Sequence, residues 1–259
     1  MTLKEVILEN IKYIIMNKIL KFTIVLVLMT ISASAYAQFG IEANYLYTNI
    51  YTRDKSDDNL TRDKFDGNGV RVGINYNFKI GKRFCIQPGV SYSYIKNNVR
   101  QMMEDGIIGG IDITPILDFT NMDVKWSEHY VSVPIYFKYR EEFVKGFALM
   151  AYTGPTLQFG IGSRMDAYSR FEKFNASYDF FSGKSVIYTP AGSMSEELDP
   201  IYNRFDVNWG IGLGVELFRF LEIQVGYDFG LMNKLKDEDI KEELHQRRDI
   251  FYVGASLRF

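Results

Sequence analysis

The feature that most constrains the fold is a two-residue alternation of apolar and polar side chains, which recurs in segment after segment. Successive side chains of a β-strand point to opposite faces of its sheet, so each segment predicts a strand with one apolar face and one polar face. The apolar rows contain no charged residue. The segments span residues 39–48, 70–80, 84–94, 131–139, 147–161, 205–217, 221–231 and 251–259.

The polar rows indicate where the apolar rows face. A soluble sheet buries its apolar face, whereas a membrane barrel turns that face toward lipid. Here the polar rows combine glycine with charges of both signs, which suits a narrow barrel interior where these charges neutralise one another. We therefore predict a charge network in the lumen. Its members are Glu42, Arg71, Lys79, Lys138, Asp206, Glu216, Glu222, Asp228 and Arg258.

Connection lengths support a membrane barrel. Short connections lie at 81–83, 140–146 and 218–220, and long ones at 50–66, 96–128, 162–204 and 233–248. Alternation of short and long connections is typical of outer-membrane barrels, with short periplasmic turns and long extracellular loops. We predict an all-β fold, an eight-stranded antiparallel transmembrane β-barrel.

Two features complicate the strand assignment. Segments 174–181 and 184–189 flank Ser182-Gly183 and predict a hairpin, and segments 111–119 and 122–126 predict strand extensions. We expect both to be extracellular ribbons, with a ten-stranded barrel as the alternative. In addition, Pro88, Pro134 and Pro155 fall inside predicted strands, where each removes a hydrogen-bond donor. Bulges or positions at the barrel rim are the expected accommodation.

The chain ends in an alternating apolar row. We expect this last strand to close the barrel, which leaves no sheet edge in lipid, and to carry the signal for the barrel-assembly machinery. The row consists of Phe251, Val253, Ala255, Leu257 and Phe259.

The N-terminal segment predicts export. Two lysines precede an apolar run at 23–31, and Ala35 and Ala37 form an A-x-A cleavage site. We predict a signal peptide at 1–37 and a barrel domain at 38–259, with Gln38 as the first mature residue. A membrane anchor is the alternative, but the run is shorter than the roughly 20 residues of a span. Residues 1–15 precede a complete signal and suggest a misassigned start.

Composition excludes several kinds of site. A single cysteine and two histidines argue against a disulfide framework and a metal centre. A net charge of −2 gives no electrostatic footprint for nucleic acid. We therefore expect no cofactor, no metal and no nucleic-acid partner.

One cluster has the residue types of a catalytic relay. Ser127, Glu128 and His129 are contiguous, so on a strand Glu128 points away from the other two and no relay forms. We predict no catalytic residue and no enzymatic activity. Five aspartates at 54–66 lack the spacing of an EF-hand and alternate with arginine and lysine, which indicates a solvated loop.

Four motifs occur in a fixed order: YVSVPIYFKY at 130–139, YTGP at 152–155, GIGLGVE at 210–216 and GYDFGLMN at 226–233. Together with the leader and the terminal phenylalanine, they resemble the outer-membrane β-barrel domain family common in Bacteroidetes, often called PorT-like. The resemblance implies an outer-membrane barrel. Members of that family have varied roles, including protein secretion and porin-like functions, so only the location is transferred to this chain.

We expect a non-enzymatic integral outer-membrane protein with a role in surface interaction, envelope integrity, or assembly and secretion. Its expected partners are outer-membrane lipid, the barrel-assembly machinery, and envelope or secretion components. A narrow porin-like channel for small solutes is the first alternative. A soluble lipocalin-like carrier is the second.

Overall fold

The protein is described by a computed structural model over residues 39–54, 63–98, 107–108, 111–112, 122–169, 175–238, 241 and 244–259. The predicted signal peptide, with its cleavage site at Ala35, Ala37 and Gln38, lies outside these residues. Most of the aspartate-rich first loop also lies outside them. Within the described ranges, no helix is long and apolar enough to cross a membrane.

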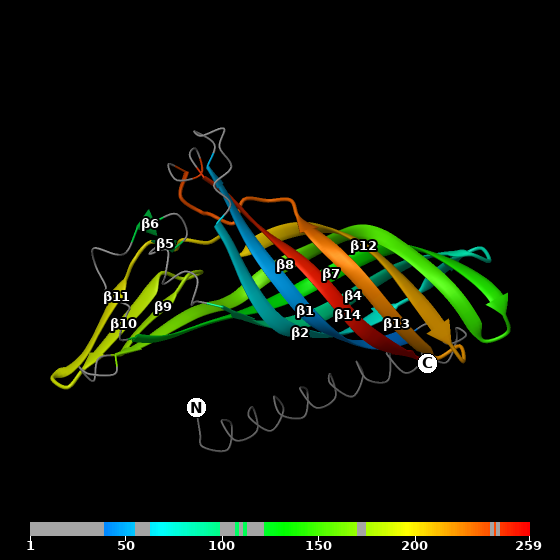
Figure 1. Cartoon of the computed structure of the whole chain (residues 1–259), viewed down its shortest axis with the longest axis horizontal. Coiled ribbons are helices and arrows are strands. Elements are labelled where there is room, and N and C mark those ends of the chain that lie inside the picture. Colours follow the sequence, from blue (N-terminus) through cyan, green and yellow to red (C-terminus); the bar gives the residue numbers. More distant parts are fainter. Residues whose placement is uncertain are drawn as a thin grey trace, which may run out of the picture. The chain divides into compact units, whose positions relative to one another are not determined.

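The described chain consists almost entirely of antiparallel strands (Figure 1). They are β1 (Phe39–Asp54), β2 (Asp63–Tyr76), β3 (Phe78–Ile80), β4 (Phe84–Asn97), β5 (Ile107–Ile108), β6 (Ile111–Asp112), β7 (Met122–Val144), β8 (Phe147–Ser169), β9 (Asn175–Asp179), β10 (Lys184–Thr189), β11 (Gly192–Glu197), β12 (Phe205–Leu217), β13 (Leu221–Gly230) and β14 (Leu244–Arg258). Strands β5 and β6 form a separate small sheet.

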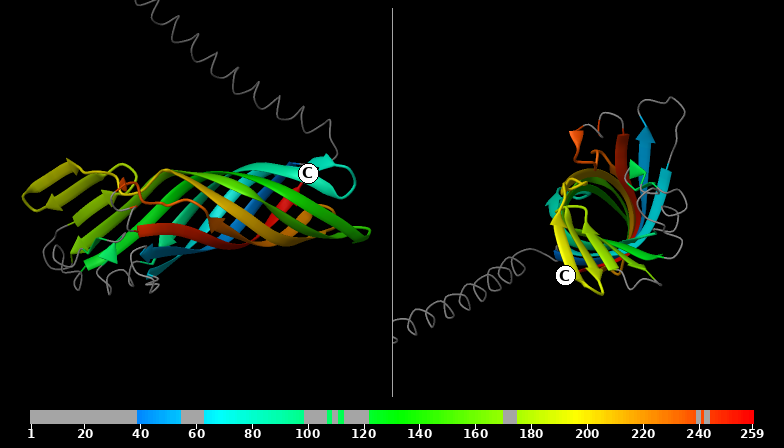
Figure 2. Two further views of the ribbon diagram at one scale, coloured as in Figure 1. Left: turned by 90° about the horizontal axis from the view of Figure 1, so that it is seen from above. Right: turned by 90° about the vertical axis from the view of Figure 1, so that its left-hand side faces the viewer.

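Eight strands form a closed ring within the unit Gly40–Arg258. The pairing runs β1-β2-β4-β7-β8-β12-β13-β14 and returns to β1. The last strand therefore pairs with the first, in register from Gly40 opposite Arg258 to Asp54 opposite Leu244. Figure 2 shows the ring along its axis. The ring has the predicted eight strands. Strand β3 continues β2 along β4 in the same register, and the other additional strands lie outside the ring.

The apolar face of each barrel strand is the outer face. In β13, Glu222 and Gln224 are buried, whereas their neighbours Ile223 and Val225 are 42% and 40% exposed. The same alternation holds along β4, β8, β12 and β14. An apolar surface around the outside and a polar interior are the reverse of a soluble barrel, and they match a barrel solvated by lipid.

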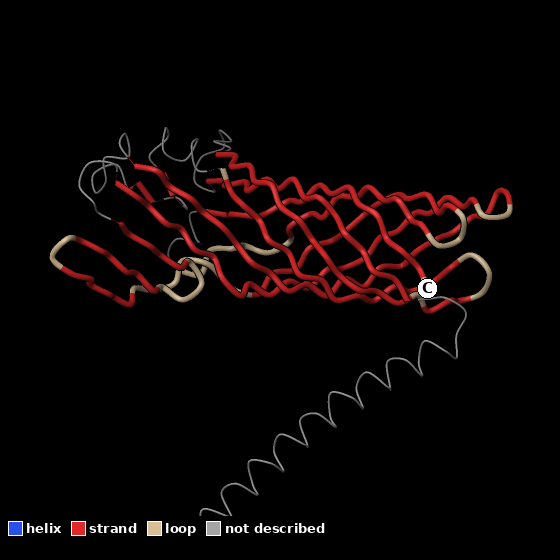
Figure 3. The backbone as a smooth tube through the Cα atoms, turned by 90° about the horizontal axis from the view of Figure 1, so that it is seen from below, coloured by secondary structure: helices blue, strands red, loops and turns tan. Residues whose placement is uncertain are grey.

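One end of the ring carries the tight turns, and we call it the turn end (Figure 3). Gly81 and Gly146 occupy their turns with φ of 80° and 87°, a conformation that glycine adopts without strain. The turn between β12 and β13 instead places Phe218 and Arg219 at φ of 56° and 68°. Strand β7 continues to Val144, so the turn between β7 and β8 is shorter than predicted.

The other end carries the long connections, and we call it the loop end. There β7 and β8 extend beyond the apolar band, and the sheet continues from β8 through β9, β10 and β11. The predicted hairpin is formed by β9 and β10, whereas β11 was not expected. Residues 244–248, expected in a loop, instead begin β14.

The expected bulges at the prolines are not found. The ladder between β4 and β7 is interrupted after Pro88, and the ladder between β7 and β8 is interrupted after Pro134. Register shifts occur elsewhere, between His129 and Tyr130 and close to Val144. The sheet therefore accommodates these prolines by omitting ladder pairs rather than by adding a residue.

Glycines on the inner wall of β12 and β13 make room for tyrosine rings. A Cβ atom at Gly212 would lie 2.2 Å from the Tyr152 ring, and one at Gly226 would lie 2.4 Å from the Tyr252 ring. Such distances are shorter than van der Waals contact. The tyrosine rings therefore extend over the neighbouring strands, because the residues paired with them, Gly212 opposite Tyr152 and Gly226 opposite Tyr252, have no side chains.

We predict that Gly226→Ala destabilises the barrel, because the added methyl group overlaps the Tyr252 ring and approaches the Tyr152 hydroxyl at 2.9 Å. The expected loss is about 1–3 kcal/mol, typical of overpacking. The matched control, Ala255→Val, enlarges a lipid-facing residue and should change stability little. The measurement is the urea midpoint of the folded, heat-modifiable gel band. Equal midpoints for the glycine variant and the wild type would contradict the packing described.

Candidate functional site

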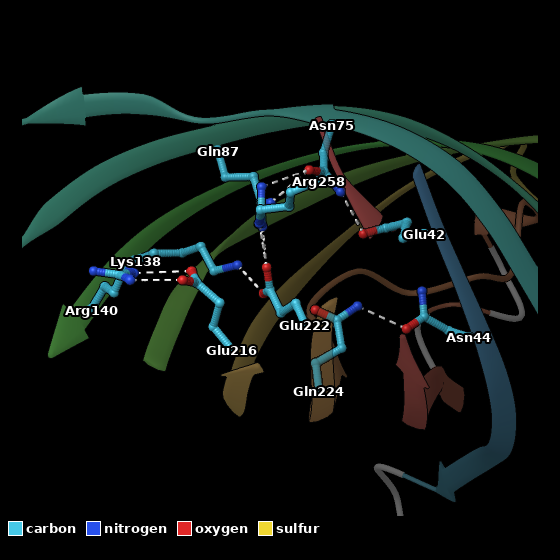
Figure 4. Close-up of polar contacts among 10 residues, drawn as sticks. All are labelled: Glu42, Asn44, Asn75, Gln87, Lys138, Arg140, Glu216, Glu222, Gln224 and Arg258. Carbon is cyan, nitrogen blue, oxygen red and sulfur yellow. Dashed lines mark hydrogen bonds and ion pairs between the residues drawn. The ribbon is translucent and has the colours of Figure 1, made fainter. Parts of the chain in front are cut away.

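The interior polar residues form three clusters along the barrel axis. The turn-end cluster is centred on Glu222, whose carboxylate is fully buried and contacts both Lys138 and Arg258 (Figure 4). Arg258 Nε lies 2.7 Å from Glu222 Oε2. Asn75 donates to Glu42 at 2.9 Å and accepts from Gln87 at 2.8 Å. One carboxylate thus compensates two cations contributed by β7 and β14.

A second ion pair lies next to this cluster. Arg140 donates from Nε and Nη2 to the two carboxylate oxygens of Glu216, at 3.0 and 2.7 Å. This bidentate geometry is the strongest form of an arginine–carboxylate pair. Gln224 of β13 donates at 2.8 Å to Asn44 of β1, which lies two strands away along the ring. Figure 4 shows that these contacts point into the lumen from several strands.

The middle cluster pairs Arg71 of β2 with Asp228 of β13. Arg71 Nη2 lies 3.0 Å from Asp228 Oδ2, and the two side chains are 4% and 0% exposed. The Tyr136 hydroxyl donates to the same carboxylate at 3.4 Å. The Arg71 guanidinium lies 5.3 Å from the centroid of Tyr252, and Tyr136 packs against Tyr152 with ring centroids 5.2 Å apart. Charges and rings together fill the lumen at this level.

The loop-end cluster surrounds Glu128 of β7. Its carboxylate contacts Arg248, accepts from Asn97 at 2.7 Å and from Tyr130 at 2.8 Å, and lies 3.3 Å from Lys234 Nζ. All five side chains are buried. Lys234 belongs to the connection between β13 and β14, so this loop returns to the mouth of the barrel.

An aromatic layer covers the loop-end cluster. Phe180 stacks on Tyr202 with ring centroids 5.0 Å apart, and Trp126 lies 5.1 Å from Phe180. Tyr202 bridges to Leu235, and Lys234 Nζ lies 4.6 Å from the Tyr202 ring. These side chains belong to the buried apolar cluster of the loop end. Two connections of the loop end thus plug the mouth with their own side chains.

The charges of the described lumen residues balance. The cations are Arg71, Lys138, Arg140, Lys234, Arg248 and Arg258, and the acids are Glu42, Glu128, Glu216, Glu222 and Asp228 of the clusters together with the buried Asp206 of β12. Among the described residues, six basic and six acidic side chains leave no excess of either sign in the lumen. Such an interior has no net charge with which to attract one class of ion.

The predicted network residues do not all meet. Lys138, Glu222 and Arg258 contact one another, Arg71 contacts Asp228, and Glu216 contacts Arg140 instead of another predicted member. Glu42 joins through Asn75, and Asp206 is buried and accepts from the backbone N–H of Val207 at 2.8 Å. Lys79 is exposed near the turn end, opposite Cys85.

Four charged members of the clusters were not predicted. Arg140 and Arg248 have the same parity as the polar rows of β7 and β14. Extending the alternation by one residue to Arg140 and by three residues to Arg248 would have found them. Glu128 also has this parity. Lys234 lies in a connection, where no period is available to indicate the direction of its side chain.

The remaining predicted residues lie on the outer wall. Ser127 and His129 face outward, whereas Glu128 faces the lumen, so the three side chains form no relay. The residues of the predicted C-terminal signal, Phe251, Val253, Ala255, Leu257 and Phe259, are exposed. In the described part of the chain, no group of three or more His, Cys, Asp or Glu side chains is arranged to hold a metal ion.

Two groups of the loop-end cluster have shifted pKa values. The apolar outer row of β7 ends at Val131, so Glu128 lies beyond the membrane-spanning part. Burial alone would raise the pKa of Glu128, but the charges of Arg248 and Lys234 and two hydrogen bonds lower it to about 2. Burial and the charge of Arg248 lower the pKa of Lys234 to about 8.

The closed ring, its lipid-facing apolar surface and its polar interior define an integral outer-membrane β-barrel. The chain belongs to the outer membrane protein beta-barrel domain family, whose model matches residues 30–236. The protein is therefore assigned to the outer membrane. No curated protein matches the chain.

Solved structures of outer-membrane barrels are similar to this chain at a distance. Ail, the attachment invasion locus protein of Yersinia pestis, shares 13% identity over 86% of this chain and 99% of its own, with a TM-score of 0.38. A major outer membrane protein from Thermus thermophilus shares 12% identity over 87% of this chain and 100% of its own, with a TM-score of 0.42. Neisserial surface protein A shares 11% identity over 87% of this chain and 100% of its own, with a TM-score of 0.40. Family membership rests on the family model alone.

We predict that acid opens the plugged mouth. Because the pKa of Glu128 is about 2 in the folded state and 4.5 ordinarily, the unfolded chain binds the proton more tightly. The stability from Glu128 is therefore complete above about pH 4.5 and is lost as the pH falls toward 2. The measurement is Trp126 fluorescence in a Trp209→Phe background, which removes the second tryptophan.

The control for this titration is Glu128→Gln, which removes the titrating group. This variant should be less stable at neutral pH, because Arg248 and Lys234 lose their shared carboxylate. It should also lack the fluorescence transition between pH 4.5 and 2. An identical acid transition in the variant would show that Glu128 does not hold the mouth closed.

Proposed function

We propose that this protein is a non-enzymatic outer-membrane barrel with a closed lumen that acts through its extracellular surface. The observation that carries the proposal is a difference between the ring, whose interior is filled, and the part of the sheet that extends beyond the ring. Inside the ring, three clusters fill the lumen, while beyond it the sheet continues from β8 to β11. The proposed role is surface interaction, with envelope integrity and assembly or secretion as the wider roles that such interaction serves.

The interior favours this role over a porin-like channel. Tyr136, Tyr152 and Tyr252 occupy the middle of the lumen against a glycine wall, and the aromatic layer covers the mouth. The balanced charges offer no selective field for ions. An eight-stranded barrel is also just wide enough for side chains to fill its interior.

The extracellular sheet supports an interaction role. Every residue of β11 is exposed, and Met194 at its centre is 70% exposed. Among the described strands, β11 pairs only with β10, so its other edge presents backbone N–H and C=O groups. An edge strand of this kind is a recurrent site for pairing with an extended segment of another chain.

The absence of enzymatic activity is part of the proposal. The one candidate relay is divided between two faces of β7, with Ser127 and His129 outside and Glu128 engaged by cations inside. Glu128 has no access to a substrate bound on the outer wall. We therefore propose that the buried charged residues of the lumen hold the barrel together.

We further propose which partners the protein contacts and to which branch of its family it belongs. Outer-membrane lipid contacts the apolar band, and the exposed terminal row from Phe251 to Phe259 contacts the barrel-assembly machinery. The loops are proposed to contact envelope or secretion components. The four ordered motifs and the terminal phenylalanine support a place in the PorT-like branch.

We predict that a photo-crosslinker at Met194 captures protein in intact cells, because β11 lies at the exposed edge of the extracellular sheet. The matched control is a crosslinker at Leu213, a residue 62% exposed on the lipid-facing wall of β12, which should capture lipid. The measurement is the mass shift of the tagged chain after illumination. The same purified protein should give no conductance steps in planar bilayers.

Two outcomes would contradict the proposal. If crosslinkers at Ser193, Met194 and Glu196 capture no protein, the extracellular sheet is not an interaction surface. If the wild type conducts and the conductance is lost on neutralising Arg71 or Glu216, the narrow channel is the better account.

A further inference from the structure

A row of polar side chains crosses four strands of the outer wall near the loop end. The pairing places Asn68 of β2 opposite Lys96 of β4, Lys96 opposite Ser127 of β7, and Ser127 opposite Arg164 of β8. Asn68, Lys96 and Ser127 have the parity of the outer face, and the register shift between His129 and Tyr130 turns the exposed Arg164 to the same face. Since adjacent strands lie about 5 Å apart, a lysine and an arginine lie on either side of one serine.

The depth of this row follows from the residues below it. Tyr92, Val131 and Phe159 form an apolar rung of this wall, and Val70, Tyr94 and His129 form the next. Lys96 lies four residues beyond Tyr92, about 13 Å along the strand and less along the membrane normal because barrel strands are tilted. Long basic side chains can also reach back toward the interface. The row therefore lies at the level of the outer-leaflet headgroups.

The groups in the row suit a phosphate. Lys96 is exposed, and the side chain of Arg164 is 60% exposed with its Nε held 2.8 Å from Asp166 Oδ1. An ammonium, a hydroxyl and a guanidinium donate to the oxygens that a phosphate presents. In the next rung, Lys125 lies opposite Asp166, and Asp66, which accepts from Asn98 at 3.4 Å, precedes Asn68 on the outer face of β2. The two rungs together contain three cations and two carboxylates, which leaves an excess of one positive charge.

The rung beneath offers a platform of rings. His129 Nδ1 lies 2.5 Å from the Tyr92 hydroxyl, and its ring centroid lies 5.1 Å from that of Tyr94. Rings of this kind pack against sugar and upper acyl carbons at a membrane interface. Polar donors above and rings below match the order of groups in a phosphorylated lipid.

The opposite wall differs at a comparable depth. On β14, Asp249 lies between Tyr227, whose hydroxyl donates to it at 3.0 Å, and Arg247, whose Nη2 lies 3.7 Å away. Asn49 of β1 pairs with this acid. A buried carboxylate at this position would repel a phosphate, so the basic row is specific to the β2–β4–β7–β8 wall.

We propose that Lys96, Ser127 and Arg164 bind the phosphate group of an outer-leaflet glycolipid, with His129 and Tyr94 packing against the part of the lipid below it. This inference goes beyond the proposed function and requires only the outer-membrane location. The ligand class is a lipid phosphomonoester. Its negative charge is matched by the row, and its apolar part lies beside the aromatic rung.

The test measures binding of bisphosphorylated lipid A to the purified full-length chain in detergent by native mass spectrometry. The double variant Lys96→Gln/Arg164→Gln should weaken this binding by about tenfold or more, because two charge-assisted contacts are removed. The control is Arg53→Gln/Arg247→Gln, which removes the same charge from the exposed loop end of β1 and β14. It should change binding by less than about twofold. The heat-modifiable gel band shows that each variant is folded.

Two further probes identify the source of the phosphate. Dephosphorylated lipid A should bind the wild type as weakly as bisphosphorylated lipid A binds the double variant. Inorganic phosphate at the same concentration as the lipid should not displace bisphosphorylated lipid A from the wild type. Equal binding by the folded double variant, or equal binding of dephosphorylated lipid, would overturn the site. Full competition by inorganic phosphate would overturn the lipid as its ligand.

Discussion

The structure depends on the hydrogen bonding between β1 and β14. A sheet that faces lipid cannot end in an open edge, because unpaired backbone groups in hydrocarbon cost several kcal/mol each. The last strand meets the first over the whole of β1 from Gly40 to Asp54, and all eight strands thereby acquire two neighbours. Closure with eight strands then fixes a narrow lumen, and every inward side chain has to be accommodated there.

The lumen contents follow from that restriction. Charged side chains enclosed in a narrow, water-poor interior are stable only when each has a partner of opposite sign. Glu222 serves both Lys138 and Arg258, and Arg71 of β2 meets Asp228 of β13, which is distant in the sequence. These pairs link strands that do not neighbour one another in the ring. The interior thus stabilises the barrel, and the proposed functions depend on the outer wall and the sheet of β9, β10 and β11.

Much of the barrel could be predicted because a strand has a period of two and a membrane barrel exposes its apolar face. The same period indicated the direction of Arg71 and Glu222. It did not reveal partners, since contacts across the lumen depend on tilt and stagger, and Glu216 meets Arg140 instead of a predicted member. Lys79 has the inward parity of its segment but lies beyond the break between β2 and β3.

At the loop end the hairpin of β9 and β10 was predicted, but the plug of the mouth and β11 could not be, for a different reason. Phe180, Tyr202 and Lys234 lie in connections, where no period relates a residue to a face. Strand β11 was missed because Gly192–Glu197 has one apolar side chain, Met194, and therefore no alternating row, and the strand is held by backbone pairing with β10. The plug and the extracellular sheet both depend on tertiary contacts between segments with no regular pattern.

The central claim is that buried pairs across the lumen bind distant strands together, and a double-mutant cycle on Arg71 and Asp228 tests it most directly. The variants are Arg71→Met, Asp228→Asn and their combination, with the exposed Arg83–Glu141 pair (3.0 Å) as the reference cycle. The account predicts that the double variant loses far less stability in urea than the sum of the single variants. Additivity within about 0.5 kcal/mol, as expected for independent sites, would contradict it.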